Sequence, residues 1–281
     1  MEAVGRGRQA LRIGSKDFAI KGHTYVMGIL NVTPDSFSDG GSYNTIDRVL
    51  YRVEEMVREG MDVLDIGGES TRPGYTPISE KEEIDRISTV IEKVKSSFNV
   101  PISVDTYKAK VAQAGIRAGA DMVNDIWGLK FDVGMADVIA SENITCCIMH
   151  NRKEADYENF MEEVLWDLEK SLDIAHQAGI DDKRIILDPG VGFGKNYKNN
   201  LEVIDRLDML HSLGYPILLG ASRKSVIGLS LDLPVSERVE GTLVTSVYAV
   251  LKGAMFVRVH DIKENVRAIR MAEALRDGYR N

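Results

Sequence analysis

The chain has 281 residues, of which 44% are hydrophobic and 28% are charged, the balance of a globular enzyme with enough apolar material for a core. The formal net charge is −8, because 35 Lys and Arg residues face 43 Asp and Glu residues, and no basic block could follow a phosphate backbone. No stretch reaches the roughly 20 apolar residues of a membrane-spanning helix. We therefore expect neither a nucleic acid nor a membrane among its partners.

The two cysteines, Cys146 and Cys147, are neighbours in an apolar run with the pattern of a strand. Adjacent strand residues point to opposite faces, so a disulfide between these two is implausible. The sequence from Met1 to Arg12 is rich in Gly and Arg and contains no apolar segment like that of a secretory signal. These features favour a reducing compartment, and we expect a cytoplasmic protein.

After a lead-in hairpin within residues 11–24, strand-like runs alternate with helical segments eight times along the chain. The expected strands cover residues 24–32, 62–69, 101–106, 122–126, 145–150, 184–190, 216–222 and 255–260. They are almost continuously apolar, which is typical of parallel strands buried on both faces. Several helical segments end on Gly, a common helix C-terminus. The segment LDLPVSERVE after the seventh strand predicts two helices divided near Pro234.

Eight strand and helix units in about 250 residues fit a closed barrel better than an open doubly wound sheet, which usually has fewer strands. No linker rich in Gly, Ser or Pro interrupts the alternation, so a second domain has no obvious place. We therefore expect an α/β fold: a single-domain (β/α)8 TIM barrel over residues 25–281, preceded by a lead-in segment over residues 1–24.

Polar residues stand at the ends of nearly all the expected strands. They are Asn31, Glu69, Asp105, Asn124, Asp125, His150, Asp188, Ser222, Arg223, Lys224, Arg258 and His260. Taken alone, a carboxylate such as Asp105 could merely cap a helix or hold a loop. In a barrel, however, these positions converge on the active face, where so many polar groups are costly to desolvate without a ligand. The mixture of acids, an amide and a lysine suits a flat heterocycle with donors on one edge and acceptors on another.

Two long segments, MGILNVTPDSFSDGG (27–41) and DIGGESTRPG (65–74), resemble the signature segments of the dihydropteroate synthases. Shorter blocks match in order: SVDTYK, NDIWG, MHN, LDPGVGFGK, LLGASRKS and VRVHD, so the resemblance covers residues 25 to 265. It implies a transferase of folate biosynthesis that condenses 6-hydroxymethyl-7,8-dihydropterin diphosphate with p-aminobenzoate, giving 7,8-dihydropteroate and diphosphate. It also implies small-molecule substrates, Mg²⁺ as cofactor, and a homodimer formed through the last barrel helices; sulfonamides, which target this family, mimic p-aminobenzoate.

The resemblance also assigns residues to each part of the site. The implied pterin site consists of Asp105, Asn124, Ile126, Met149, Asp188, Gly220, Lys224 and Arg258, with Arg258 stacking on the ring. Asn31, Arg258 and His260 would bind the diphosphate, and Asn31 would also bind the metal. The implied p-aminobenzoate site consists of Thr71, Arg72, Pro73, Phe193, Lys224 and Ser225. The catalytic residues would be Asp105, Asp188, Lys224 and Arg258.

The sequence contains no Ser-His-Asp or Cys-His arrangement, which agrees with a reaction that needs no covalent protein nucleophile. We expect SN1-like loss of diphosphate, with Asp105 and Asp188 stabilising the positive charge that grows on the pterin methylene.

Three alternatives remain at this stage. The first is a methyltetrahydrofolate-dependent corrinoid methyltransferase, whose barrel has a similar pterin pocket but lacks the two signature segments. The second is a paralogue that keeps the fold and binds a pterin without catalysis. The third is an unrelated barrel acting on a sugar phosphate, which would give Asn124 and Asp188 no purpose.

Overall fold

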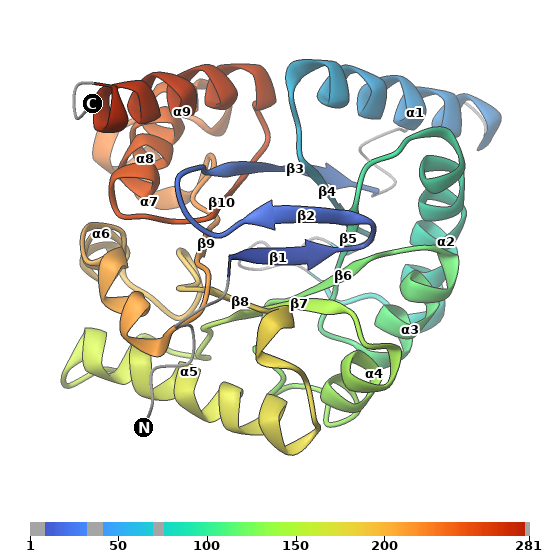
Figure 1. Cartoon of the computed structure of the whole chain (residues 1–281), viewed down its shortest axis with the longest axis horizontal. Helices are drawn as coiled ribbons and strands as arrows, with labels where there is room; N and C mark the ends of the chain where they lie inside the picture. The colour runs from blue at the N-terminus through green and yellow to red at the C-terminus, as the bar shows by residue number, and fades with distance from the viewer. Residues whose placement is uncertain (1–8, 33–41, 70–75, 279–281) are drawn as a thin grey trace.

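The computed structural model describes residues 9–32, 42–69 and 76–278, and begins with the predicted lead-in hairpin. Strands β1 (Ala10–Ile13) and β2 (Lys16–Ala19) pair antiparallel and lie across one end of the molecule (Figure 1). Their buried side chains Leu11, Ile13 and Phe18 pack on the first residues of the barrel strands, among them Val63 and Met122. The hairpin therefore covers the amino-terminal end of the barrel.

The eight remaining strands form the predicted parallel barrel. They are β3 (Tyr25–Asn31), β4 (Val63–Gly67), β5 (Ile102–Asp105), β6 (Met122–Asp125), β7 (Thr145–Met149), β8 (Ile185–Asp188), β9 (Leu218–Leu219) and β10 (Phe256–Val259). Their order is β8-β7-β6-β5-β4-β3-β10-β9, and a parallel bridge between Leu187 and Ile217 closes the ring. Every strand thus ends at the same face of the barrel.

One strand is much shorter than its sequence pattern suggests. The apolar run 216–222 pairs as a strand only at Leu218 and Leu219. Pro216 has no N–H to donate to a ladder, and beyond Leu219 the chain turns at Gly220 toward the site. The other seven predicted strands agree with the structure to within two residues at each end.

Helices surround the barrel as an outer layer (Figure 1). They are α1 (Ser42–Glu59), α2 (Glu80–Ser97), α3 (Ala109–Ala118), α4 (Met135–Glu142), α5 (Phe160–Gln177), α6 (Tyr197–Asp205), α7 (Ser225–Leu231), α8 (Val239–Leu251) and α9 (Ile262–Asp277), with 3₁₀ turns at Asp182–Arg184, Leu207–Leu213 and Val235–Glu237. As predicted, the chain breaks at Pro234 between α7 and α8. None of the helices in the described ranges is long and apolar enough to cross a membrane.

Both faces of the barrel strands are buried, in agreement with their apolar composition. Cys146 and Cys147 are both buried free thiols on β7, and no disulfide joins them. Cys146 contributes to the layer between strands and helices, whereas Cys147 belongs to the cluster inside the barrel under the hairpin. Adjacent strand residues thus face opposite sides, as the sequence suggested.

Candidate active site

A cavity of about 390 Å³ opens at the carboxyl ends of the barrel strands, a size typical of small-molecule sites. Its wall is formed by Ile29, Asn31, Asn124, Ile126, Met149, Asp188, Gly192, Phe193, Gly220, Ser222, Arg223, Lys224, Ser225, Val235, Arg238, Arg258 and His260. This wall contains every described residue that the resemblance assigns to a ligand except Asp105. Asp105 is buried and hydrogen-bonds to two wall residues, Asn124 and Arg258.

Arg258 on β10 lines the cavity and bridges two carboxylates from other strands. Its Nε lies 2.5 Å from Oδ2 of Asp65, and its Nη2 lies 2.5 Å from Oδ2 of Asp105. Asp105 also accepts a hydrogen bond of 3.4 Å from Asn124 Nδ2. Burial raises the pKa of Asp105 to about 7, although the charge of Arg258 opposes the shift. Burial disfavours the charged form of Arg258, but Asp65 and Asp105 outweigh it and raise its pKa.

A second acid and base pair, Asp188 and Lys224, faces the cavity from β8 and from the residue before α7. Asp188 Oδ1 accepts a hydrogen bond of 2.7 Å from Gly190 N, and Lys224 Nζ donates one of 2.5 Å to Val191 O. Burial raises the pKa of Asp188, and burial lowers that of Lys224 to about 8, with Asp188 opposing the latter shift. Asp188 Oδ2 makes no hydrogen bond with the described residues.

Gly220 leaves the space between these two side chains open. A Cβ at this position would lie 3.5 Å from Asp188 Oδ2 and 3.9 Å from Lys224 Nζ. Any larger residue would therefore fill the volume into which both polar groups project. The site thus offers an acceptor and a donor on either side of a narrow gap.

The chain reaches Lys224 through a strained residue. Arg223 has φ +56°, in the left-handed region that non-glycine residues rarely adopt. Its guanidinium is fixed by Asp261, with Nε 2.9 Å from Oδ2, and its N–H donates to Thr242 Oγ1 at 3.0 Å. Such strain persists only where the surroundings impose it. Here it aims Lys224 into the cavity, 4.8 Å from the centre of the Phe193 ring.

The mouth of the cavity carries Asn31, Ser222 and His260. Ser222 Oγ lies 3.0 Å from His260 Nδ1, and the backbone N–H of His260 donates to the same oxygen at 3.2 Å. Arg238, at the start of α8, also lines the cavity, and its guanidinium donates to the carbonyl oxygens of Arg223 and Leu233. These groups make the rim richer in donors than in acceptors, which suits an anionic ligand.

Comparison with known proteins agrees with this geometry. Residues 27–260 match the family model described as pterin binding enzyme. The chain is 55% identical to the dihydropteroate synthase of Clostridium beijerinckii, over 94% of this chain and 99% of that protein. It is 49% identical to the Bacillus subtilis dihydropteroate synthase, over 95% and 94% respectively.

Solved structures extend the likeness to three dimensions. The dihydropteroate synthase of Clostridium difficile, crystallised in the presence of pteroic acid, has a TM-score of 0.89 and 48% identity, over 93% of this chain and 99% of that one. The Xanthomonas albilineans enzyme with 4-aminobenzoic acid has a TM-score of 0.90 and 38% identity, over 96% and 98%. This chain belongs to the dihydropteroate synthases. It is thus a transferase of folate biosynthesis, and neither the corrinoid methyltransferase nor the sugar-phosphate barrel describes it.

Besides Asp105, three of the polar strand ends expected at the mouth of the barrel do not line the cavity. Glu69 accepts from Tyr107 Oη at 2.7 Å and from Lys108 Nζ at 2.8 Å, and so braces a loop. Asp125 accepts from the backbone N–H groups that follow it. His150 is completely buried beside Lys195. The hydrogen-bond partners of all three side chains lie outside the cavity wall.

Two residues of the site, Asp65 and Arg238, are not among those expected from the sequence. Asp65 lies within a buried strand rather than at its end, and only its charge among apolar neighbours in VLDIG could have revealed it. Arg238 follows the helix break at Pro234, where no strand end draws attention to it. Thr71, Arg72 and Pro73, expected at the p-aminobenzoate site, lie outside the described residues.

The described residues include no cluster of three or more His, Cys, Asp or Glu side chains that could hold a metal ion. The expected metal ligand, Asn31, lines the cavity. Magnesium commonly binds to one or two protein ligands together with substrate phosphates. Among the described residues, a single amide side chain at the cavity fits a metal that would arrive with a phosphate-bearing substrate, and does not fit a resident metal centre.

Proposed function

We propose that this dihydropteroate synthase binds the pterin between Asp188 and Lys224 and transfers its methylene group to p-aminobenzoate. The observation that carries the proposal is the unused hydrogen-bonding capacity of that pair across Gly220. The Asp188 carboxylate would accept from the 2-amino group and N3–H of the ring, and Lys224 would donate to O4 and N5. Asp105 and Asn124 would bind the other edge, between the walls formed by Ile126 and Met149.

The diphosphate would lie at the mouth of the cavity, against Asn31, Arg258 and His260. Arg258 would reach the first phosphate while its other side remains anchored to Asp65. Asn31 would contribute its amide oxygen to Mg²⁺, which would offset the charge of the leaving group. Removal of comparable electrostatic help commonly costs about 10² to 10³ in rate.

The buried charges favour a dissociative reaction. Three carboxylates (Asp65, Asp105, Asp188) and two cations (Lys224, Arg258) leave an excess of one negative charge when all are ionised. As the carbon to oxygen bond breaks, its electron pair leaves with the diphosphate and positive charge grows on the pterin methylene. The excess negative charge would stabilise that cation until the arylamine nitrogen attacks it and loses a proton.

The p-aminobenzoate would bind beside the Phe193 ring, between Lys224 and Ser225, with Thr71, Arg72 and Pro73 completing its site. Phe193 and Ser225 both line the described cavity. Sulfonamides, for which the related Yersinia pestis dihydropteroate synthase has been crystallised in complex, would compete for this position.

We also propose a cytoplasmic homodimer. An apolar surface on α6, α7 and α8 includes the exposed side chains of Leu201, Leu231, Val244 and Tyr248. A contiguous patch of this kind commonly marks an interface. Val244→Glu should convert the dimer to a monomer in light scattering, and a wild-type protein that is already monomeric would contradict the assembly.

The decisive assay follows 7,8-dihydropteroate formed from pterin diphosphate and p-aminobenzoate, with and without Mg²⁺. Product that requires both substrates and the metal supports the proposal, whereas tight pterin binding with no turnover would indicate a non-catalytic paralogue. A second assay omits p-aminobenzoate. Slow diphosphate release under that condition supports the dissociative step, and complete absence of release and of any trapped pterin cation would contradict it.

A further inference from the structure

Behind the cavity wall, Lys195 holds the loop that carries Phe193. Its Nζ donates to the carbonyl oxygen of Phe193 at 3.1 Å and lies 2.7 Å from His150 Nδ1. No carboxylate of the described chain lies within ion-pair distance of this ammonium group. Lys195 is therefore not an ordinary member of a salt bridge, and its two partners are a backbone carbonyl and a neutral acceptor.

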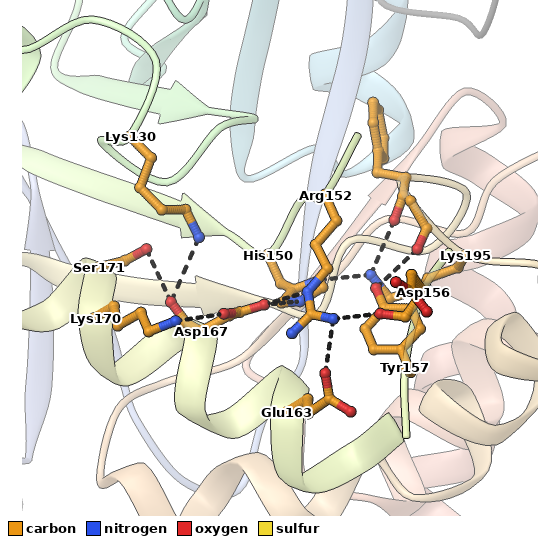
Figure 2. Close-up of polar contacts among 12 residues, drawn as sticks. Lys130, His150, Arg152, Asp156, Tyr157, Glu163, Asp167, Lys170, Ser171 and Lys195 are labelled. Atoms are coloured by element: carbon orange, nitrogen blue, oxygen red, sulfur yellow. Dashed lines mark hydrogen bonds and ion pairs between the residues drawn. The ribbon is translucent and has the colours of Figure 1, made fainter. Parts of the chain in front are cut away.

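His150 is the fixed support for Lys195. Its side chain is completely buried, and burial lowers its pKa to about 4, so the ring is neutral at pH 7. Since Nδ1 accepts from Lys195, the ring proton resides on Nε2, which lies 3.3 Å from Asp167 Oδ2 without the alignment of a hydrogen bond. Arg152 Nε in turn holds the same Asp167 oxygen at 2.5 Å. Figure 2 shows this chain of contacts, which runs from Lys195 through His150 to α5.

The backbone of the loop that carries Phe193 also packs directly against the backbone of the segment that contains His150 and Arg152. Gly190 and Gly194 both have positive φ, and a Cβ on either would collide with the carbonyl oxygen of His150 or Arg152 respectively. Tyr157 Oη donates to Gly194 O at 2.7 Å (Figure 2). These contacts fix the two ends of the loop, while its middle projects toward the cavity.

The two ligand-facing residues of this segment are held in different ways. Asp188 belongs to β8, is paired in register with Met149, and receives the Gly190 N–H. Phe193 lies in the loop itself, where the contacts to its backbone are its own N–H to Gly190 O at 3.1 Å and the bond from Lys195. Loss of Lys195 should therefore release Phe193 and leave Asp188 in place.

We propose that Lys195, supported by His150, is a positioning residue that sets the Phe193 wall of the cavity and hence the affinity for p-aminobenzoate. The proposal rests on the proposed function, because that function assigns Phe193 to the p-aminobenzoate site. Lys195 does not line the cavity itself and acts through the loop.

The role does not depend on the charge of Lys195. Burial lowers its pKa to about 7, with Asp188 opposing and Lys224 and Arg152 reinforcing the shift, while Asp167 opposes it weakly. A neutral amine still has two hydrogens, one for Phe193 O and one for His150 Nδ1. Lys195 can therefore hold the Phe193 loop both above and below neutral pH.

The test compares Lys195→Met with Lys198→Met, an exposed lysine three residues farther along that serves as the matched control. We expect Lys195→Met to raise KM for p-aminobenzoate about tenfold, as loss of one buried hydrogen bond permits. The Kd for the pterin, measured by calorimetry, and kcat should change less than about threefold. Lys198→Met should leave all three unchanged. Equal weakening of pterin and p-aminobenzoate binding would indicate general loosening and overturn the proposal.

Substitution of His150, which supports Lys195, gives an independent test through the same KM for p-aminobenzoate. His150→Asn keeps an acceptor near the Nδ1 position and should raise KM less than threefold, whereas His150→Leu should match Lys195→Met. The double variant Lys195→Met with His150→Leu should be no worse than either single variant, because both remove one interaction. Additive effects would overturn the proposal. If Lys195→Met does not fold, Lys195→Gln, which keeps one donor, should give about a threefold rise, and an unchanged KM would count against the role.

The variant Phe193→Leu distinguishes failure of the positioning role of Lys195 from failure of the assignment of Phe193 to the p-aminobenzoate site. If Phe193→Leu raises KM for p-aminobenzoate and Lys195→Met does not, the binding site stands and the positioning role fails. If Phe193→Leu leaves KM unchanged, the assignment of Phe193 fails, and the role of Lys195 fails with it.

Discussion

Two lysines of this barrel, Lys108 and Lys224, differ in how completely their hydrogen bonds are satisfied. Lys108, after β5, donates to Glu69 at 2.8 Å, to Glu83 at 2.7 Å and to Ile78 O at 2.8 Å, so each hydrogen of its ammonium group has an acceptor. Lys224 donates only to Val191 O among the described residues. Both lysines follow barrel strands, and both are accompanied by buried acids.

Their acidic neighbours differ in the same way. Both oxygens of Glu69 accept hydrogen bonds, from Tyr107 Oη, Lys108 Nζ and Ile78 N. Within the described ranges, Asp188 accepts only at Oδ1. A saturated cluster has nothing left for a ligand and contributes to folding, whereas an unsaturated one keeps donors and acceptors available for a substrate. We call the cluster of Lys108, Glu69 and Glu83 the brace. The saturation of its hydrogen bonds, more than charge or position, distinguishes the brace from the Asp188 and Lys224 pair of the binding site.

Removal of Lys108 should produce the largest effect on stability. Lys108→Met leaves Glu69 and Glu83 buried without their cation, and breaking a buried ion pair in this way typically costs about 3 to 5 kcal/mol. Urea unfolding at pH 7 measures the loss. The control is Lys110→Met, which removes an exposed lysine paired with Glu80 and should cost less than about 1 kcal/mol. Similar losses of unfolding free energy in the two variants would mean that the buried Lys108 stabilises the fold no more than an exposed lysine does.

Removal of the Asp188 charge should act on binding instead. Asp188→Asn keeps an acceptor for Gly190 N but can no longer accept from two pterin donors, so pterin affinity should fall about 10- to 100-fold by calorimetry. Stability should hold or rise, because burial raises the pKa of Asp188 and penalises its charged form in the folded state. That gain is present at pH 7 and disappears as the pH falls through the ordinary Asp pKa. Near-normal pterin affinity would contradict the assignment.

The sequence indicated the barrel and most of the cavity wall, because strand periodicity and the polar strand ends are local features. It did not separate Asp188 from Glu69, since both were expected at strand ends and only the packing of Lys108 and Tyr107 shows that Glu69 is already occupied. It also overlooked Asp65, whose partner Arg258 lies 193 residues away in sequence. Contacts across the barrel are set by strand register and by side-chain direction, which a single sequence does not display.

Two ionisable side chains of the site, Asp105 and Lys224, should determine the pH dependence. Asp105, with a pKa raised to about 7 by burial, must be ionised to accept from the pterin, and Lys224, with a pKa lowered to about 8 by burial, must be protonated to donate. The kcat/KM for pterin diphosphate should therefore peak between pH 7 and 8 and fall about tenfold per pH unit on either side. In Lys224→Arg the guanidinium stays protonated, so the alkaline limb should disappear. An unchanged alkaline limb would assign it to another group.

The smallest effect should come from Glu83, the second acid of the brace. Burial raises its pKa, with Lys108 opposing, so the folded state is penalised for its charge. Glu83→Gln removes that penalty and keeps an oxygen for the Lys108 bond, and Glu69 still balances the lysine charge. The loss of a charge-assisted bond and the relief of desolvation should nearly cancel, within about 1 kcal/mol in urea unfolding. A loss as large as that of Lys108→Met would mean that Lys108 needs both carboxylates ionised, and that the brace is held by net charge as well as by saturated hydrogen bonds.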